Sequence, residues 1–223
     1  MIRKYICLLL CAVLLMASVP VFASGGSGAS GDGGAPAVLR IGVSTWKTTD
    51  IEGASCKKVL DDAARALGVK IIYAEHGGDP LKAAQTPELL CDAGCKAIVF
   101  CSTSDEDLQA ALDVCEERKI PMVEACRILS ENTSPELYQK AAESDIFIGN
   151  VTDEMTGMQV SFSRTKPATL LKAFLLAYNA AEGNIEEEAE DADEPFRIIQ
   201  VPESEDVSTL TEDDIRKMAE KGV

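Results

Sequence analysis

The side chains best suited to bind a small molecule stand where predicted strands end. Trp46, the only tryptophan, follows a predicted strand at Val38–Val43, and Arg127 follows another at Ile120–Val123. In open α/β sheets small ligands bind outside the carboxyl ends of parallel strands, because the loops that leave those strands gather at one edge. The predicted ligand-binding residues at this edge are Ser44, Thr45, Trp46, Ser102, Thr103, Arg127 and Asn150.

Trp46 and Arg127 offer complementary chemistry. An indole face stacks on the apolar C–H surface of a polar ring and leaves the hydroxyls of that ring to polar neighbours. A guanidinium presents a planar fork of donors to ring oxygens or to a carboxylate. Each residue also has a structural interpretation. Trp46 fits a core or interface aromatic, and Arg127 fits a surface salt bridge in so acidic a chain.

Hydroxyl and amide side chains complete the predicted edge. Ser102, Thr103 and Asn150 match loops that face a ligand, but these residue types are common in helix caps and turns, and that structural role is favoured for them. Nothing in the order or spacing pairs a nucleophile with a base, and His76, the only histidine, is interpreted as a loop residue. We therefore predict a protein that is not an enzyme and that carries no cofactor.

The cysteines do not form a metal-binding pattern. Cys91 and Cys95 are separated by three residues, and with a single histidine a metal site would need thiolates for nearly every ligand, so no metal site is predicted. Cys101 and Cys126 end adjacent predicted strands, which lie about 4.8 Å apart, within the Cα range of a disulfide. We predict a disulfide between them if their side chains face each other, since a one-residue register difference turns the two sulfurs to opposite faces.

Strands and helices alternate along the chain and position these residues. Lys96–Arg127 forms a β-α-β unit, in which Ser104 and the acids after it start a helix between two apolar runs. The other predicted strands are Val38–Val43, Val69–Ala74, Asp145–Gly149 and an edge strand at Phe196–Val201, with a polar turn at Asn150–Gly157. The other predicted helices are Glu52–Leu67, Pro80–Gly94, one starting at Ser134, Ala168–Gly183 and Leu210–Lys221. We predict an α/β fold with a parallel sheet in the order 2-1-3-4-5, helices on both faces, and the Ala168–Gly183 helix beside the first one.

The two ends of the chain differ from this pattern. A positively charged start, an apolar run and a Val-Phe-Ala site predict a signal peptide at residues 1–23, cleaved after Ala23, with an uncleaved membrane anchor as the alternative. Residues 24–37 are predicted to be a flexible Gly/Ser linker, and residues 38–183 the folded lobe. Residues 184–223 are predicted to be an acidic loop and tail, whose Glu186–Glu194 run lacks the ordered ligand spacing of a calcium site. The expected location is the periplasm.

The charge of the chain excludes some partners. Its formal net charge at pH 7 is −16. A surface this negative repels phosphate backbones and anionic lipid, so neither nucleic acid nor a membrane surface is expected to bind.

Several short stretches occur in an order and spacing that resemble one family. They are Ile41-Gly42-Val43-Ser44, Gly77-Gly78-Asp79-Pro80 followed by Gln85, Gly94–Val99, and Ile120–Val123. Together they resemble the first lobe of type 1 periplasmic sugar-binding proteins, the ribose-binding-protein-like solute receptors of ABC transporters. The resemblance covers Val38–Gly157 and resumes at Leu170–Gly183. It implies an exported solute-binding protein that takes a sugar or similar polar small molecule for ABC-type import, with an ABC permease or membrane receptor as partner.

The sequence departs from this family at two places. The fourth strand of the family usually ends in an Asp-Arg pair, where this chain has Cys126-Arg127, and most of the second lobe is missing between Gly157 and Leu170. The resemblance therefore also fits a one-lobe derivative, a chain completed by a second copy, or a nonfunctional truncated copy. A periplasmic sensory or interaction module that contacts a membrane receptor is the alternative function. An enzyme of flavodoxin-like shape would need a Gly-rich phosphate loop, and Ser44–Thr49 contains no glycine.

Overall fold

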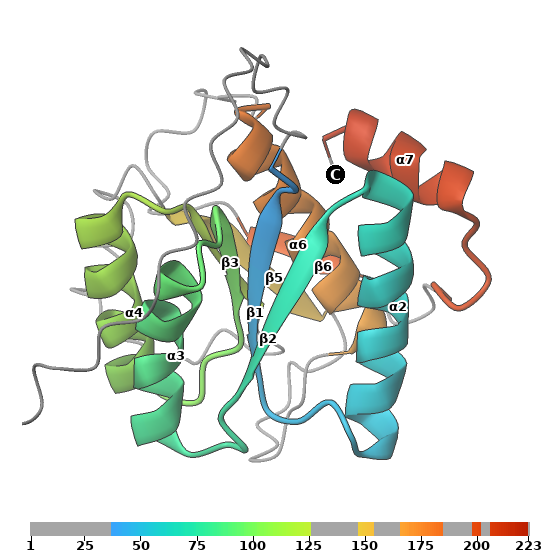
Figure 1. Ribbon diagram of the computed structural model, residues 1–223. Helices are drawn as coiled ribbons and strands as arrows, with labels where there is room; N and C mark the ends of the chain where they lie inside the picture. Colours follow the sequence, from blue (N-terminus) through green and yellow to red (C-terminus); the bar gives the residue numbers. More distant parts are fainter. Residues whose placement is uncertain (1–36, 126–146, 154–165, 185–197, 202–205, 223) are drawn as a thin grey trace, which may run out of the picture. The chain divides into compact units, whose positions relative to one another are not determined.

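The computed structural model describes residues 37–125, 147–153, 166–184, 198–201 and 206–222 (Figure 1). The predicted signal peptide, nearly all of the predicted linker, the predicted helix at Ser134 and the Glu186–Glu194 run lie outside these residues, so those assignments stay predictions. No helix in the described part of the chain is both long enough and apolar enough to cross a membrane.

Six described strands form one parallel sheet in the order β2-β1-β3-β4-β5-β6. Their bounds are β1 Arg40–Thr45, β2 Lys70–Glu75, β3 Ala97–Phe100, β4 Met122–Ala125, β5 Phe147–Asp153 and β6 Ile198–Val201. The predicted order 2-1-3-4-5 is confirmed, and β6 adds the expected edge strand beside β5. Buried parallel strands consist of continuous apolar runs, and the Ala97–Phe100 run is fully buried for this reason.

Helices cover both faces of the sheet, as predicted. Their bounds are α2 Ile51–Leu67, α3 Pro80–Asp92, α4 Asp105–Arg118, α6 Pro167–Glu182 and α7 Glu212–Glu220. α3 and α4 pack over one face with Leu90, Phe100 and Leu112. α2, α6 and α7 cover the other face with Leu60, Phe174 and Ile215, and α6 packs against α2 (Figure 1).

Local sequence sets the ends of the helices. Asp50 accepts a hydrogen bond from the Gly53 N–H at 2.8 Å at the start of α2, and Gly68 ends α2 in a left-handed conformation. Ser104 accepts the Asp107 N–H at 3.2 Å, which confirms the predicted start of α4. Lys166 precedes α6 without making a side-chain cap.

The bounds of β1, β2 and β6 differ from the sequence prediction by one or two residues at an end, and the larger differences at β4 and β5 have a physical reason. β4 begins at Met122 rather than Ile120, because Pro121 has no N–H to donate and takes part only as the acceptor for the Ile98 N–H at 3.0 Å. β5 continues to Asp153, so the polar turn predicted from Asn150 is wrong up to that residue. The physical reason is pairing on both sides, since Asn150 is in register with Glu124 of β4 and Ile198 of β6.

Candidate functional site

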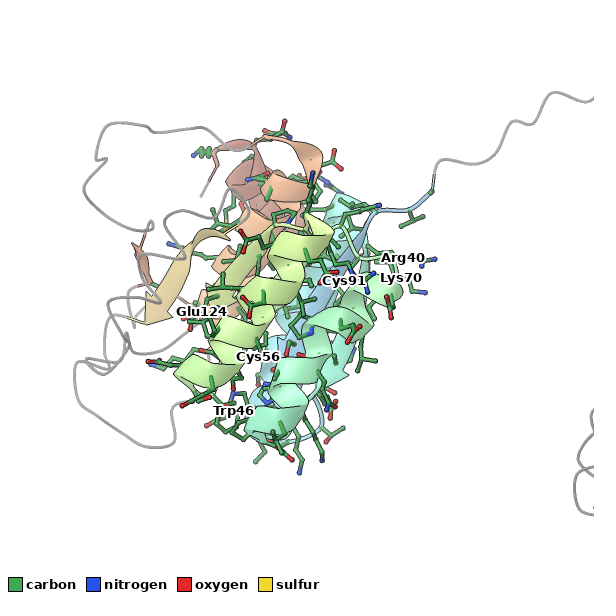
Figure 2. All side chains as sticks on the ribbon, turned by 90° about the vertical axis from the view of Figure 1, so that its left-hand side faces the viewer. Arg40, Trp46, Cys56, Lys70, Cys91 and Glu124 are labelled. Carbon is green, nitrogen blue, oxygen red and sulfur yellow. The ribbon has the colours of Figure 1, made fainter. Side chains whose placement is uncertain are left out.

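The candidate site is the carboxyl edge of the sheet, which we call the rim. It consists of the loops after β1, β2 and β3, residues 46–50, 76–79 and 101–104, together with the starts of the helices that follow. Figure 2 shows Trp46 and Glu124 toward this end of the strands, while Arg40 and Lys70, which begin β1 and β2, lie toward the other end. The parallel order therefore brings the predicted loops together at one edge.

Trp46 is half-buried and held by the loop after β2. Its indole lies so close to Gly78 that a Cβ on that glycine would stand 2.7 Å from Cζ3 of the ring. The Gly77 N–H donates to the Trp46 carbonyl oxygen at 2.8 Å, and the His76 ring centroid lies 5.7 Å from that of the indole. Part of the indole packs on the core that α2 and α6 share, so Trp46 combines a structural role with exposed aromatic surface at the rim.

The buried side chain of His76 supports the same loop, the one after β2. It is 1 % exposed, and its Nδ1 accepts the Gly78 N–H at 3.1 Å, so the proton of the neutral ring lies on Nε2. Nε2 makes no hydrogen bond within the part of the chain that the structure describes. Burial lowers the pKa of His76, while the Cys101 backbone and the Asp79 carboxylate act in the opposite direction. The ring is therefore kept neutral and serves as an acceptor for the glycine loop.

The hydroxyls at the end of β1 lie under the rim. Ser44 is fully buried, and its Oγ is 2.6 Å from the Thr86 hydroxyl of α3. Thr45 is half-buried, and its carbonyl oxygen accepts the His76 N–H at 2.9 Å. The structure thus directs Ser44 toward α3 rather than toward a ligand, and Thr45 ties β1 to the loop after β2.

Ser102 and Thr103 are engaged by buried carboxylates. The Ser102 hydroxyl donates to Oε1 of Glu124, which is 5 % exposed. The Thr103 N–H lies 3.1 Å and 3.0 Å from the two carboxylate oxygens of Asp107, and the Thr103 hydroxyl also donates to this group. Burial raises the pKa of Asp107, against the hydrogen bonds from Thr103 and Ser104. Thr103 thus has the structural role at the start of α4 that its residue type favours.

The remaining predicted site residues are only partly described. Arg127 and Cys126 lie outside the described residues, so the polar anchor and the Cys101–Cys126 disulfide stay predictions. Cys101 is buried at the end of β3. Asn150 belongs to β5, in register with Glu124.

Three carboxylates at the rim were not predicted as site residues. Glu75 accepts the Thr48 N–H at 3.2 Å and closes the loop after β1. Glu124 and Asp107 each take a hydroxyl from the loop after β3. The signal for Glu124 was an acid inside an apolar strand, but a helix-start acid such as Asp107 gives no signal, since acids are ordinary there.

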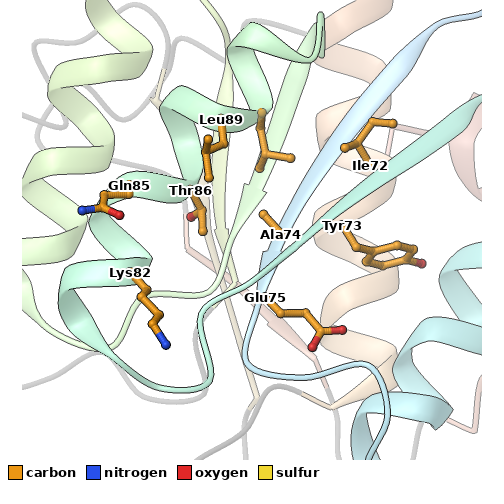
Figure 3. Close-up of a pocket in the computed structure, with 9 residues that line it drawn as sticks. Ile72, Tyr73, Ala74, Glu75, Lys82, Gln85, Thr86 and Leu89 are labelled. Carbon is orange, nitrogen blue, oxygen red and sulfur yellow. The ribbon is translucent and has the colours of Figure 1, made fainter.

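A pocket also lies at the open side of β2. It has a volume of about 350 Å³ and lies between β2 and α3, with Ile72, Thr86 and Leu89 among its lining residues (Figure 3). Within the described ranges, no group of histidine, cysteine and acidic side chains is placed to hold a metal ion.

No protein-family model matches the chain, and no curated protein matches it in sequence. Solved structures with a similar course of the chain include an ABC transporter solute-binding protein from Agrobacterium vitis bound with α-D-tagatopyranose, at 18 % identity and TM-score 0.40, covering 52 % of this chain and 38 % of that one. Another is an ABC transporter solute-binding protein from Mycobacterium smegmatis with bound glycerol, at 15 % identity and TM-score 0.39, covering 73 % and 55 %. The transcription regulator CcpA of Lactococcus lactis has 16 % identity and TM-score 0.37, covering 73 % and 58 %.

The chain spans between 38 % and 58 % of the lengths of these three proteins. They include both solute-binding proteins and a transcription regulator, and at these TM-scores they assign no function.

Proposed function

We propose that the protein is an exported solute-binding protein, which binds a sugar or similar polar small molecule at the rim for ABC-type import. The observation that carries the proposal is Trp46, a half-exposed indole fixed at the carboxyl edge of a parallel sheet by Gly78 and His76. A rigid aromatic plate at this edge suits the apolar face of a sugar ring.

The polar groups near Trp46 suit the hydroxyls of such a ligand. The Ser102 and Thr103 hydroxyls donate inward to Glu124 and Asp107, which leaves their oxygen lone pairs to accept from ligand hydroxyls. The carboxylates behind them orient the two hydroxyls without touching the ligand. Arg127 is the proposed donor on the opposite side, as expected from its place after β4.

The affinity is expected to be low. Receptors with two lobes enclose the ligand, whereas this rim provides the contacts of one lobe. We expect a Kd of about 1 mM, or roughly −4 kcal/mol, unless a second chain closes the site. Delivery to an ABC permease follows from the same proposal.

A titration of Trp46 emission with a panel of neutral sugars tests the proposal, with calorimetry as the independent measure of binding. Because Trp46 is the only tryptophan, its emission reports the rim alone. The expected result is a saturable change in emission, with affinity lowered at least about ten-fold in Trp46→Ala. A sugar that binds by calorimetry, leaves the emission unchanged and binds Trp46→Ala equally well would show that the rim is not the site.

A further inference from the structure

Within the described residues, no hydrogen bond is seen for the first backbone donors of α6. Its first backbone hydrogen bond runs from the Leu170 N–H to the Lys166 carbonyl at 3.0 Å, so the N–H groups of Ala168 and Thr169 precede the helical ladder. Lys166 supplies no side-chain cap, Pro167 has no N–H, and the first turn contains no acidic residue. Two donors therefore point out of the positive end of a 16-residue helix.

The side chain of Thr169 provides an independent observation at the same place. Thr169 is 0 % exposed, and its Oγ1 has no hydrogen-bond partner within the described residues. Because the Cα–Cβ bonds of a helix tilt toward its N-terminus, the side chain of Thr169 leans toward the end at which the two N–H groups lie. A buried hydroxyl without a partner costs free energy, and a ligand that accepts its hydrogen bond removes that cost.

The start of α6 belongs to the rim. α6 connects the parallel strands β5 and β6, so it runs back along the sheet and begins at the edge where β5 ends (Figure 1). Ala168 lies in the same core cluster as Cys101, which follows β3, and Ala125, which ends β4, and Trp46 packs against that cluster. The unpartnered donors are therefore on the α2 and α6 side of the rim, the side on which Trp46 lies.

We infer that the start of α6 binds an anionic oxygen group, a carboxylate or a phosphate, of the small molecule that occupies the rim. The donors are the N–H groups of Ala168 and Thr169 and the Thr169 hydroxyl, a set that matches the several acceptor sites of an oxyanion. This inference rests on the proposed function and narrows the ligand class to acidic sugars and comparable polar acids.

Charge elsewhere in the chain does not oppose this assignment at contact distance. The formal net charge of −16 repels anions at long range, but the Debye length in physiological salt is about 8 Å, so donors in direct contact dominate. The starts of α2 and α4 already have carboxylates of their own, Asp50 and Glu52 in one case and Asp105 among others in the second. The first turn of α6 contains no acidic residue.

The test compares wild type with Thr169→Val in the full chain, using inorganic phosphate, glucuronate and glucose as probes in calorimetry. Valine has the shape of threonine and removes a hydroxyl that has no partner, so the variant should melt at or above the wild-type temperature. The affinity for phosphate and glucuronate should fall about ten-fold, and the affinity for glucose should stay the same.

Thr86→Val is the matched control. The Thr86 hydroxyl is buried, lies 2.6 Å from the Ser44 hydroxyl and donates to the Ala83 carbonyl at 2.8 Å, on the other face of the sheet. This variant should therefore melt lower than wild type while its affinity for phosphate stays unchanged. It separates loss of stability from loss of the anion site.

The outcomes separate this inference from the proposed function. If wild type binds no phosphate, or if Thr169→Val binds it as tightly, the inference is wrong whatever the sugars do. If glucose binds at Trp46 as tightly as glucuronate, the inference is wrong and the proposed function stands. If phosphate binds through Thr169 but neither sugar binds, the anion site is confirmed and the proposed sugar ligand is wrong.

Discussion

At the scale of single residues, the rim depends on how closely the indole of Trp46 approaches the backbone at Gly78. A glycine is required there for two reasons, since its φ is +81° and an added Cβ would stand 2.7 Å from the ring. The neighbouring Gly77 has φ +65° but open space around its Cα. Alanine substitutions at Gly77 and Gly78 can therefore separate the effect of backbone strain from the effect of contact with Trp46.

Gly78→Ala should destabilise the protein more than Gly77→Ala does. Both variants place a side chain in the left-handed region, at a cost of about 1 kcal/mol each, and Gly78→Ala adds an overlap with Trp46 that costs about 1–3 kcal/mol more. Urea unfolding followed by Trp46 emission measures both terms. Equal losses of stability, with an unchanged emission maximum, would mean that the indole does not pack on Gly78.

His76 should make stability depend on pH below its ordinary pKa of 6.5. Burial lowers its pKa from the ordinary value of 6.5, so between the lowered and the ordinary value the unfolded chain binds a proton that the folded chain does not. The stabilisation is complete above the unfolded pKa and is lost as pH falls through this window, by at most about 1.4 kcal/mol per pH unit. Chemical unfolding at a series of pH values measures it.

His76→Gln is the control for this pH dependence, since a glutamine oxygen also accepts the Gly78 N–H but does not titrate. His76 is the only histidine, so the fall in stability as pH drops below the ordinary pKa of 6.5 should disappear in the variant. A slope that persists would assign the titration to another group. Burial raises the pKa of Asp107 above its ordinary value of 3.8, so its titration persists in His76→Gln and is common to both proteins.

The environments of two side chains, His76 and Ser44, could not be predicted from the sequence. The loop position of His76 was predicted, but its burial against Gly78 and Trp46 depends on how the loops after β1 and β2 meet, which no local pattern encodes. Ser44 was predicted at the rim because it ends an apolar strand, yet the alternation of the strand turns its side chain toward Thr86. Because successive side chains of a strand point to opposite faces, a shift of one residue decides whether a side chain can contact a ligand or is buried.

At the scale of elements, periodicity predicted the helices and the order of the first five strands. α2 and α4 were predicted correctly because apolar spacing, a capping residue and a terminal glycine or acidic first turn all agree. β5 was predicted too short because its pairing with β4 and β6 extends Asn150–Asp153, and that pairing is a long-range effect. Residue types that are common in turns can thus form part of a strand when the strands on both sides provide backbone pairing.

Contact between α3 and β1 gives a prediction at this scale. A Cβ at Gly42 would stand 2.9–3.1 Å from side-chain atoms of Leu90, so the helix lies directly on the strand there. Gly42→Ala should lower the free energy of unfolding by about 1–3 kcal/mol through overpacking. Urea unfolding measures the loss.

A double-mutant cycle with Leu90→Ala checks the cause. Leu90→Ala alone should cost about 2–5 kcal/mol, because Leu90 is 1 % exposed and leaves a cavity. In the double variant the overlaps of the alanine methyl at position 42 with the two Leu90 Cδ atoms are gone and only the contact with Cβ at 3.0 Å remains, so the combined loss should be smaller than the sum of the two single losses. Strict additivity would show that Gly42 is needed for another reason.

At the scale of the whole molecule, two places compete as the ligand site. The rim gathers loops from successive parallel strands, holds Trp46 in place and adds the donors at the start of α6. The pocket between β2 and α3 borders the edge strand β2 of the sheet.

The measurement that separates the two places is a titration of the isotopically labelled protein with a sugar that binds by calorimetry, followed through the NMR signals of backbone amides and of the Trp46 indole N–H. The account predicts that the largest shifts occur at Trp46, at residues 76–79 and 101–104, and at Thr169. Shifts confined to Ile72, Thr86 and Leu89, with the Trp46 indole signal unmoved, would place the ligand in the pocket at β2 and contradict the account.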